Sequence, residues 1–256
     1  MNKLSIPYGR RLHAAMVPAA NALVVEGLSA GYPRAPRPAV NEISVRIPSG
    51  SRVALIGPNG SGKSSLLKAI AGLLPLQAGM VRIYGNPIGA CHHRVAYLPQ
   101  RGEIDWNFPI NVERLVLTGR YVHLGWLRRP SKRDYEIAHE MMARLDLTRL
   151  AQRQIGRLSG GQQQRALVAR ALAQGSDLFL LDEPLNAVDL ATCEILHEVL
   201  RELQAQGKTL VVATHDLARL EKDYNRTIHL QDGRQVAAKV ESCPKCEEER
   251  GATWTG

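Results

Sequence analysis

The stretch Gly57-Pro58-Asn59-Gly60-Ser61-Gly62-Lys63-Ser64 decides how this chain folds. It fits the phosphate-loop pattern G-x-x-x-x-G-K-[S/T]. Residues 52–56, just before it, have the composition of a buried strand, and residues 64–73, just after it, have the apolar spacing of a helix. A strand, a glycine-rich loop and a helix in this order are the setting in which the motif binds phosphate. A glycine-rich turn without a ligand is the alternative, and both flanks argue against it.

Each part of this loop has a place in binding a nucleotide. Glycines let backbone N–H groups approach phosphate oxygens where a Cβ would block them. The helix N-terminus adds a partial positive charge. Lys63 can reach the β- and γ-phosphates, and the Ser64 hydroxyl can hold Mg²⁺. The sequence therefore predicts a site for ATP and Mg²⁺ made by Gly57, Pro58, Asn59, Gly60, Ser61, Gly62, Lys63, Ser64 and Ser65.

Composition sets broad limits on the kind of protein. The chain has 256 residues, of which 45% are hydrophobic and 22% charged, as in an ordinary globular protein. No apolar run is long enough to span a bilayer. The net charge of +9 is concentrated before residue 46 and between residues 114 and 133, which suits an anionic membrane surface or nucleic acid. Aromatic residues make up only 5%, which favours the membrane surface over nucleic acid, although a merely solvated basic surface is an equal alternative.

The pattern along the chain predicts an α/β fold. Antiparallel strands are expected at residues 23–28 and 43–47, and a terminal hairpin at residues 227–238. Residues 101–157 lack buried-strand runs, so a helical subdomain is expected as an insertion at about residues 101–170. Residues 1–22 are expected to be a flexible arm, and residues 239–256 a flexible acidic tail. Buried parallel strands, which form the core sheet, are predicted at residues 52–56, 95–98, 178–181 and 209–214.

Polar groups follow each of these buried strands. Ile56 leads into the phosphate loop, and the other three strands end at Gln100, at Asp182-Glu183 and at His215. Ligands of open α/β sheets bind at the carboxyl ends of the strands, so we expect these groups to meet at one nucleotide. Asp182 suits Mg²⁺, and Glu183 suits the polarisation of an attacking water. Gln100 could bind the metal or the water and His215 the γ-phosphate, although either residue taken alone is more often structural.

A second helix start lies far along the chain from the first. Leu158-Ser159-Gly160-Gly161-Gln162 opens a helix, and Ser159 with Gln162 forms a capping-box pattern. The two glycines leave the backbone N–H groups accessible, as in an anion-binding site. The sequence supplies no nearby ligand for it.

These features closely resemble the ATP-binding subunits of ABC transporters, in the family's order, through residues 23–238. The resemblance implies a P-loop NTPase fold, with Gly57 to Ser64 as the Walker A loop and residues 158–162 as the LSGGQ signature. It also implies a Q-loop at Gln100, a Walker B segment at residues 178–183, a D-loop at Asp189, a switch histidine at His215 and, at Tyr32, an aromatic ring that stacks on adenine. Asn186-Ala187-Val188 replaces the usual Gly-Leu pair before Asp189.

The resemblance further implies a head-to-tail homodimer with two sandwiched ATP molecules. Each ATP would lie between one Walker A loop and the partner's Ser159, Gly160, Gly161 and Gln162. Closure and opening of this dimer would drive a separate permease from the cytoplasmic face of the membrane. Nucleic acid is not an expected partner.

Residues 100–109 resemble the corresponding segment in bacterial manganese, zinc and iron importers, which also use an extracytoplasmic solute-binding protein. Trp106 and Phe108 are hypothesised to shape the permease-docking groove, with packing inside the helical subdomain as the alternative. Two competing functions remain: an ABC ATPase acting on nucleic acid or ribosomes, and a P-loop kinase, which would leave the signature unexplained. Local metal sites at Cys91-His92-His93 and at Cys243 with Cys246 are weaker alternatives to a solvent-exposed loop and a plain acidic tail.

Overall fold

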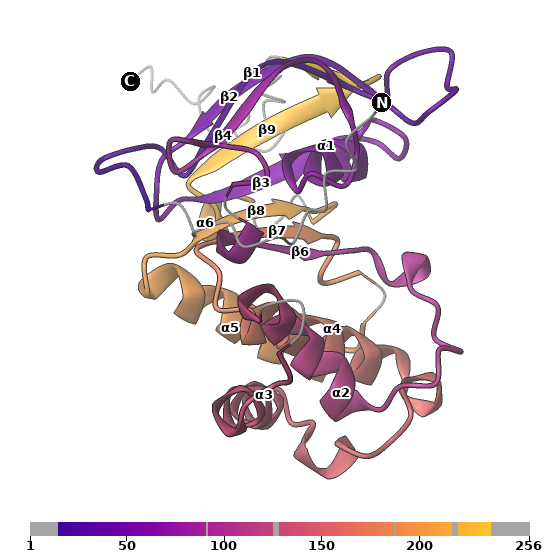
Figure 1. Ribbon diagram of the computed structural model, residues 1–256. Coiled ribbons are helices and arrows are strands. Elements are labelled where there is room, and N and C mark those ends of the chain that lie inside the picture. Colours follow the sequence, from indigo (N-terminus) through magenta and orange to yellow (C-terminus); the bar gives the residue numbers. More distant parts are fainter. Residues whose placement is uncertain (1–14, 91, 125–127, 187, 217–219, 237–256) are drawn as a thin grey trace, which may run out of the picture.

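The computed structural model describes residues 15–90, 92–124, 128–186, 188–216 and 220–236 (Figure 1). It contains a four-stranded sheet of order β2-β1-β4-β5 and a six-stranded sheet of order β10-β9-β3-β8-β7-β6. The α/β fold with a mainly parallel core sheet is therefore confirmed. The helices between β6 and β7 form a separate layer below the parallel sheet in the view of Figure 1, as the predicted helical insertion requires.

The four-stranded sheet is the N-terminal antiparallel part. Its strands are β1 (Leu23–Ala30), β2 (Val40–Ile47), β4 (Leu76–Ile83) and β5 (Asn86–Pro87). β1 pairs antiparallel with both β2 and β4, as predicted for the first two strands. In β2 buried and exposed residues alternate, because one face packs on the core and the other meets solvent.

The chain already contacts this sheet before β1 begins. The Asn86 side-chain amide donates to the Ala15 carbonyl at 2.8 Å, and the Val17 N–H donates to the Tyr84 carbonyl at 3.1 Å. The predicted arm of residues 1–22 is therefore too long at its C-terminal end, because residues 15–22 pack on the turn between β4 and β5. Residues 1–14 and 239–256 lie outside the described part of the chain.

The six-stranded sheet supplies the edge at which the site forms. β3 (Arg52–Ile56), β7 (Leu178–Asp182) and β8 (Thr209–Ala213) are buried along their whole length, as central parallel strands should be. β6 (Val95–Leu98) runs parallel to β7. The terminal hairpin of β9 (Arg226–Gln231) and β10 (Arg234–Val236) is confirmed, and β9 also runs parallel to β3, which the sequence did not predict.

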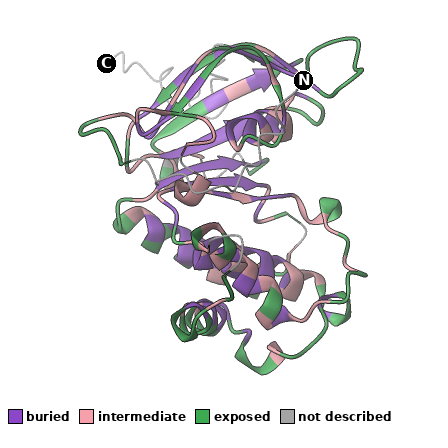
Figure 2. Cartoon of the chain, viewed as in Figure 1, coloured by how far each residue is buried: buried purple, intermediate pink, exposed green. Residues whose placement is uncertain are grey.

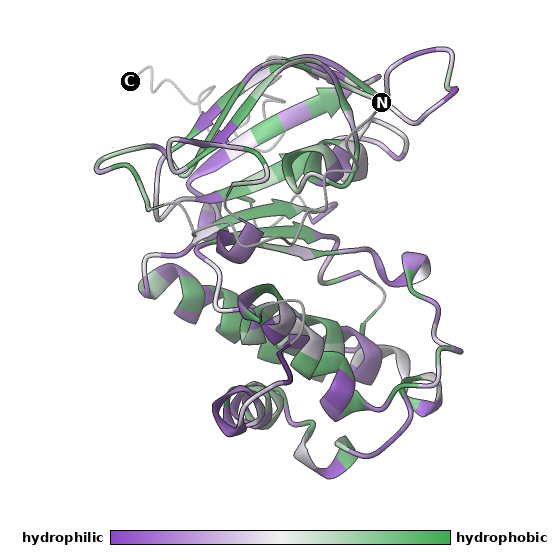
Figure 3. Ribbon diagram, in the orientation of Figure 1, coloured by the Kyte–Doolittle hydropathy of each residue, from purple (hydrophilic) through white to green (hydrophobic). Residues whose placement is uncertain are grey.

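Helices cover both faces of the parallel sheet, and the sheet separates two core clusters, because alternate residues of β7 and β8 belong to opposite clusters. Figures 2 and 3 show the buried and the hydrophobic residues of these layers. α1 (Lys63–Ile70) lies between the two sheets. α4 (Gly160–Ala173) and α5 (Leu190–Ala205) cover the other face, with α2 (Val112–Leu117) and α3 (Lys132–Arg144) packed below them. α6 (Leu220–Asp223) precedes β9. Short 3-10 helices lie at His92–Arg94, Arg101–Glu103, Thr118–His123, Thr148–Leu150 and Ile155–Arg157.

Among the described residues, no helix is both long and apolar enough to cross a bilayer.

Candidate functional site

The phosphate loop connects β3 to α1, and its glycines are fixed by the surrounding protein. Gly57 has φ 153°, and a Cβ there would lie 2.1 Å from the Leu230 carbonyl oxygen. Gly62 has φ 100° and caps α1, and a Cβ there would lie 2.8 Å from the Ala39 carbonyl oxygen. Both positions therefore require glycine for reasons internal to the fold. Gly60 has open space where its Cβ would be, but its φ of 80° also favours glycine.

Lys63 is the first residue of α1 and is only 5% exposed. Its ammonium donates hydrogen bonds to the carbonyls of Gly57 at 2.8 Å and Pro58 at 3.1 Å. Burial lowers the pKa of Lys63, while the carboxylates of Glu183 and Asp182 act in the opposite direction. The loop, the lysine and both carboxylates thus share one electrostatic environment at the end of the sheet.

Asp182 closes β7, and its side chain is prepared for a ligand. Both carboxylate oxygens are buried, and neither accepts a well-formed hydrogen bond from the described residues. Burial raises the pKa of this carboxyl, an effect that the nearby Ser64 hydroxyl reduces and Glu183 reinforces. Oxygens that are buried without partners are costly unless a cation or a donor satisfies them. This donor set fits Mg²⁺, which takes oxygen ligands.

Glu183, the next residue, lies at the centre of the predicted constellation. The side-chain amides of Gln100 and Asn186 donate to its Oε2 at 3.0 and 2.8 Å, and a ring nitrogen of His215 contacts its Oε1. Its backbone has φ 51°, a conformation uncommon outside glycine that marks strained functional positions. A cavity of about 210 Å³ lies beside Glu183, Asn186 and His215. The structure therefore brings the ends of β6, β7 and β8 together as predicted.

The signature segment starts α4 with the expected geometry. Ser159 and Gln162 form a reciprocal capping box, at 3.0 and 3.3 Å. A Cβ on Gly160 would lie 2.1 Å from a guanidinium nitrogen of Arg101. A Cβ on Gly161 would lie 2.7 Å from the Asp189 carboxylate. The two glycines therefore admit other parts of the same chain, the Arg101 guanidinium and the Asp189 carboxylate.

Asp189 has a clear local role. It caps α5, accepting hydrogen bonds from the Thr192 N–H at 2.8 Å and the Thr192 hydroxyl at 3.1 Å. The partner N–H lowers the pKa of the Asp189 carboxyl. Its contact with Gly161 ties the start of α5 to the start of α4.

Tyr32 lies in the loop between β1 and β2, and the residue is 47% exposed. Its hydroxyl is close enough to Lys68 of α1 to contribute to raising the pKa of that lysine, behind the opposing effect of burial and the larger effect of Glu103. The ring is thus accessible beside the helix that follows the phosphate loop. Its stacking on adenine remains a prediction.

Arg101 and Asn186 contact the site, but the sequence predicts a role there for neither residue. Asn186 lies three residues after Glu183 in the segment that departs from the family pattern, and that departure was the available signal. Arg101 follows Gln100 directly, but nothing in its spacing indicated a contact with Gly160.

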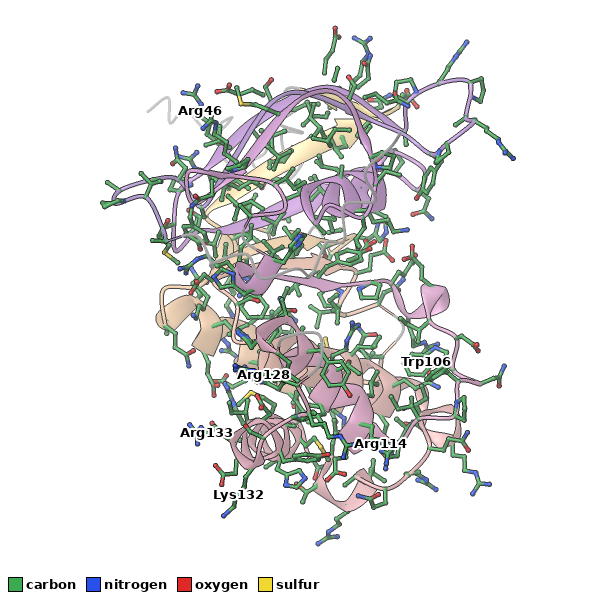
Figure 4. The ribbon with its side chains drawn as sticks, in the orientation of Figure 1. Arg46, Trp106, Arg114, Arg128, Lys132 and Arg133 are labelled. Carbon is green, nitrogen blue, oxygen red and sulfur yellow. The ribbon has the colours of Figure 1, made fainter. Side chains whose placement is uncertain are left out.

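Trp106 does not line a docking groove. It is half-buried against the core of the helical part, and its indole N–H donates to the Arg101 carbonyl at 3.1 Å. The large groove of this region, described below, includes Ile104 but neither Trp106 nor Phe108. Figure 4 shows Trp106 on the opposite side of the helical part from Lys132 and Arg133. Packing, the alternative for Trp106, is therefore the better description, while Phe108 is 56% exposed.

The weaker metal sites stay untested. Cys91, Cys243 and Cys246 lie outside the described residues. Within the described ranges, no group of three or more His, Cys, Asp or Glu side chains is arranged to hold a metal ion.

Comparisons of sequence and of structure with known proteins all indicate the same family. The ABC transporter family matches residues 40–186. The zinc transport system ATP-binding protein TroB of Treponema pallidum is 45% identical, over 87% of this chain and 85% of that protein. The manganese transport system ATP-binding protein MntB of Bacillus subtilis is 44% identical, over 78% of each chain. A dimeric ATP-binding cassette bound to ADP and phosphate after hydrolysis is similar in structure, with a TM-score of 0.72 and 27% identity over 84% of this chain and 97% of that one. This chain therefore belongs to the ABC transporter family, as a cassette that binds and hydrolyses ATP.

Proposed function

We propose that this chain is the ATP-hydrolysing subunit of an importer for a divalent metal ion. The observation that carries the proposal is the meeting of Lys63, Asp182 and Glu183 at the carboxyl edge of one parallel sheet. This combination provides a cation for phosphate, oxygens for a metal and a carboxylate for water. The relatives named for zinc and manganese transport support a divalent metal ion as the transported substrate.

The phosphate loop binds the nucleotide. Its backbone N–H groups and the α1 N-terminus face the phosphates, and Lys63 neutralises charge on the β- and γ-phosphates. Tyr32 supports the adenine ring from the loop between β1 and β2. Ser61 and Ser65 complete the lining of the phosphate site. The buried Ser61 hydroxyl, which has no hydrogen-bond partner among the described residues, fits such a role.

Mg²⁺ fits beside the phosphates. Asp182, Ser64 and Gln100 would hold it, because their oxygens are the ligands that this hard cation prefers. When bound, Mg²⁺ neutralises negative charge that develops on the phosphate oxygens. The Gln100 side-chain nitrogen already donates a hydrogen bond to Glu183, so the side-chain oxygen is the atom left to bind the metal.

Glu183 orients and polarises the attacking water. Gln100 and Asn186 on one carboxylate oxygen and His215 on the other fix the direction of the carboxylate. The neighbouring cavity of about 210 Å³ has room for a water and polar groups to bind it. His215 also reaches the γ-phosphate, which links the carboxylate to the state of the nucleotide.

The chain acts as a head-to-tail dimer that sandwiches two ATP molecules. Backbone N–H groups at the start of α4 can donate to an anion. Lys63, Asp182 and Glu183, however, all lie at the start of α1. A partner's γ-phosphate gives these donors a ligand, supplied to Ser159, Gly160, Gly161 and Gln162. The dimeric relative with bound ADP and phosphate supports this arrangement.

The partner in the membrane is a permease, with the chain attached peripherally to its cytoplasmic side. A groove of about 910 Å³ between the parallel sheet and the helical part is the place proposed for a permease segment. Leu73 and Tyr121 line it and are 63% and 52% exposed, as expected of a surface that a partner covers. An extracytoplasmic solute-binding protein completes the importer.

Uptake measurements in the source organism test the proposal. Deletion of the gene, complemented with the wild-type chain or with Lys63→Ala, is followed by uptake of labelled manganese, zinc and iron. We expect uptake of at least one metal to need the wild-type chain and to be lost with Lys63→Ala. Unchanged uptake of all three, together with co-sedimentation of the chain with ribosomes or RNA, would instead identify the non-transport alternative.

A further inference from the structure

Tyr97 lies in β6 and has no role in the site described above. The residue is half-buried, but its hydroxyl is buried and has no well-formed hydrogen bond to any described residue. A buried hydroxyl without a partner costs free energy, so its presence calls for an explanation. The explanation lies on the neighbouring strand.

The register of the parallel sheet places Tyr97 beside the end of β7. Tyr97 is opposite Leu180, and Asp182 follows two residues later, on the same face of the sheet because side chains alternate along a strand. Tyr97 and Leu180 both pack in the core cluster that contains Leu67 of α1, so this is the face that α1 covers in Figure 1. A diagonal neighbour two residues further along is within reach of a long aromatic side chain. The Tyr97 hydroxyl can therefore reach the Asp182 carboxylate.

The needs of the two groups are complementary. Burial raises the pKa of Tyr97, and the Asp182 carboxylate, to which the hydroxyl can donate, raises it further, so the hydroxyl keeps its proton. Both Asp182 oxygens are buried and accept no well-formed hydrogen bond from the described residues. A donor without an acceptor thus faces an acceptor without a donor.

The Mg²⁺ proposed for this site satisfies only part of the Asp182 carboxylate. When one oxygen binds the metal, the other stays buried and still requires a donor. A carboxylate without such a donor is also free to turn, which weakens its hold on a metal that demands a fixed geometry. Groups that hydrogen-bond a metal ligand fix its orientation and increase the affinity for the metal.

We infer that Tyr97 is a positioning residue for the proposed Mg²⁺ site: its hydroxyl donates to one Asp182 oxygen and holds the other toward the metal. The inference rests on the proposed function, because Asp182 is assigned as a Mg²⁺ ligand there. Tyr97 acts through Asp182 and does not itself bind the metal. Tyr97→Phe removes only the donor, because phenylalanine keeps the ring that packs between the sheet and α1.

Tyr84 provides a matched control at the other end of β7. It is 5% exposed, and its hydroxyl donates to the carbonyl of Asp177, the residue before β7, at 3.0 Å. Tyr84→Phe therefore makes the same change to a buried hydroxyl, but far along the strand from Asp182. It breaks a formed hydrogen bond and should lower the melting temperature, whereas Tyr97→Phe breaks none in the metal-free chain and should not.

Binding of Mn²⁺ tests the inference. Mn²⁺ takes the same oxygen ligands as Mg²⁺, and electron paramagnetic resonance measures its free concentration. The full-length chain is saturated with a non-hydrolysable ATP analogue, and the analogue without protein is the reference. We expect Tyr97→Phe to raise the Kd for Mn²⁺ about tenfold and Tyr84→Phe to leave it unchanged. Binding of the analogue in EDTA should be the same in all three chains, because the phosphate loop is intact.

A double-variant cycle tests whether Tyr97 acts through Asp182. Asp182→Asn should weaken Mn²⁺ binding more than Tyr97→Phe does, because it removes the charge of the ligand itself. Adding Tyr97→Phe to Asp182→Asn should then raise the Kd little further, as expected of two residues that act as one unit. Fully additive losses would place the effect of Tyr97 elsewhere and overturn the inference.

Three other results would also overturn it. They are a wild-type Kd for Mn²⁺ in Tyr97→Phe, an equal rise in both tyrosine variants, and a Tyr97→Phe chain that melts well below the wild type, since the hydroxyl would then serve the fold. If Asp182→Asn binds Mn²⁺ as tightly as the wild type, the proposed Mg²⁺ site itself fails, a result distinct from the others.

Discussion

Two helix starts in this molecule offer backbone donors to a ligand, and they are built differently. α1 begins at Gly62 without a side-chain cap, so a bound phosphate can take the place of the cap. α4 begins at Ser159 with a complete capping box. The first start lies beside Lys63 and two carboxylates, whereas the second has the Arg101 guanidinium packed over its first glycine.

In the proposed sandwich dimer, this difference gives each chain two complementary halves of a site. The α1 side carries the groups proposed for metal and water chemistry, and the α4 side carries the donors proposed to bind the partner's phosphate. The two sides are also physically connected within the chain. The Gln100 side-chain amide donates a hydrogen bond to Glu183, and the next residue, Arg101, packs on Gly160. A change at the carboxylate therefore has a short route to the start of α4, through one hydrogen bond, one peptide link and one packing contact.

The largest effect is expected from removing the chemistry of the α1 side. Glu183→Gln keeps the size of the side chain but removes the charge that polarises water. We expect ATP hydrolysis to fall about 10²- to 10⁴-fold while ATP binding persists and an ATP-dependent dimer accumulates. Steady-state hydrolysis, nucleotide binding and size-exclusion chromatography measure these three results. Asn186→Ala, the control, removes one donor to Glu183 and should cost much less. Near-normal turnover by Glu183→Gln would remove Glu183 from this role.

A smaller effect is expected from blocking the α4 side. Ser159→Arg places a bulky cation at the exposed helix start, so it should lower hydrolysis roughly 10²-fold by spoiling the partner's site. Binding of ATP to the dilute monomer should be unchanged, because the Walker A loop is intact. Ser159→Ala separates the two effects: it loses the cap, at a cost of about 1 kcal/mol in stability, without filling the site. Loss of ATP binding by the Ser159→Arg monomer would argue against the sandwich.

The sequence predicted the elements that bear strong local signals. The phosphate loop, the capping box of α4 and the buried runs of β3, β7 and β8 are short-range patterns, and the structure has all of them. The convergence of Gln100, Glu183 and His215 also followed, because parallel strands place their carboxyl ends at one edge. The sequence does not predict the pairing of β9 with β3, because which strands are neighbours depends on contacts between residues distant in sequence.

The missed features are long-range contacts of ordinary residues. Arg101 has no distinctive spacing, and only the fold brings it over Gly160. The sequence predicts an interface role for Trp106, because large apolar groups in a charged segment are typical of partner surfaces. In the structure its ring packs on the helical core, and the groove is formed by residues from several separate segments. Composition of one segment cannot distinguish these two outcomes, because both bury the same side chain.

The smallest effect is expected at Tyr32, which serves the α1 side from outside the phosphate site. The residue is 47% exposed, so its ring is open to a base. Tyr32→Ala should weaken ATP binding by about 1–3 kcal/mol, which corresponds to a roughly 5- to 150-fold higher Kd. Tyr32→Phe should bind almost normally, because stacking uses the face of the ring. Binding of ATP and of inorganic triphosphate, measured side by side, separates base stacking from phosphate binding: only ATP should respond to Tyr32→Ala. Equal losses for Ala and Phe would assign the effect to the hydroxyl, which lies near Lys68, and would take Tyr32 away from the adenine.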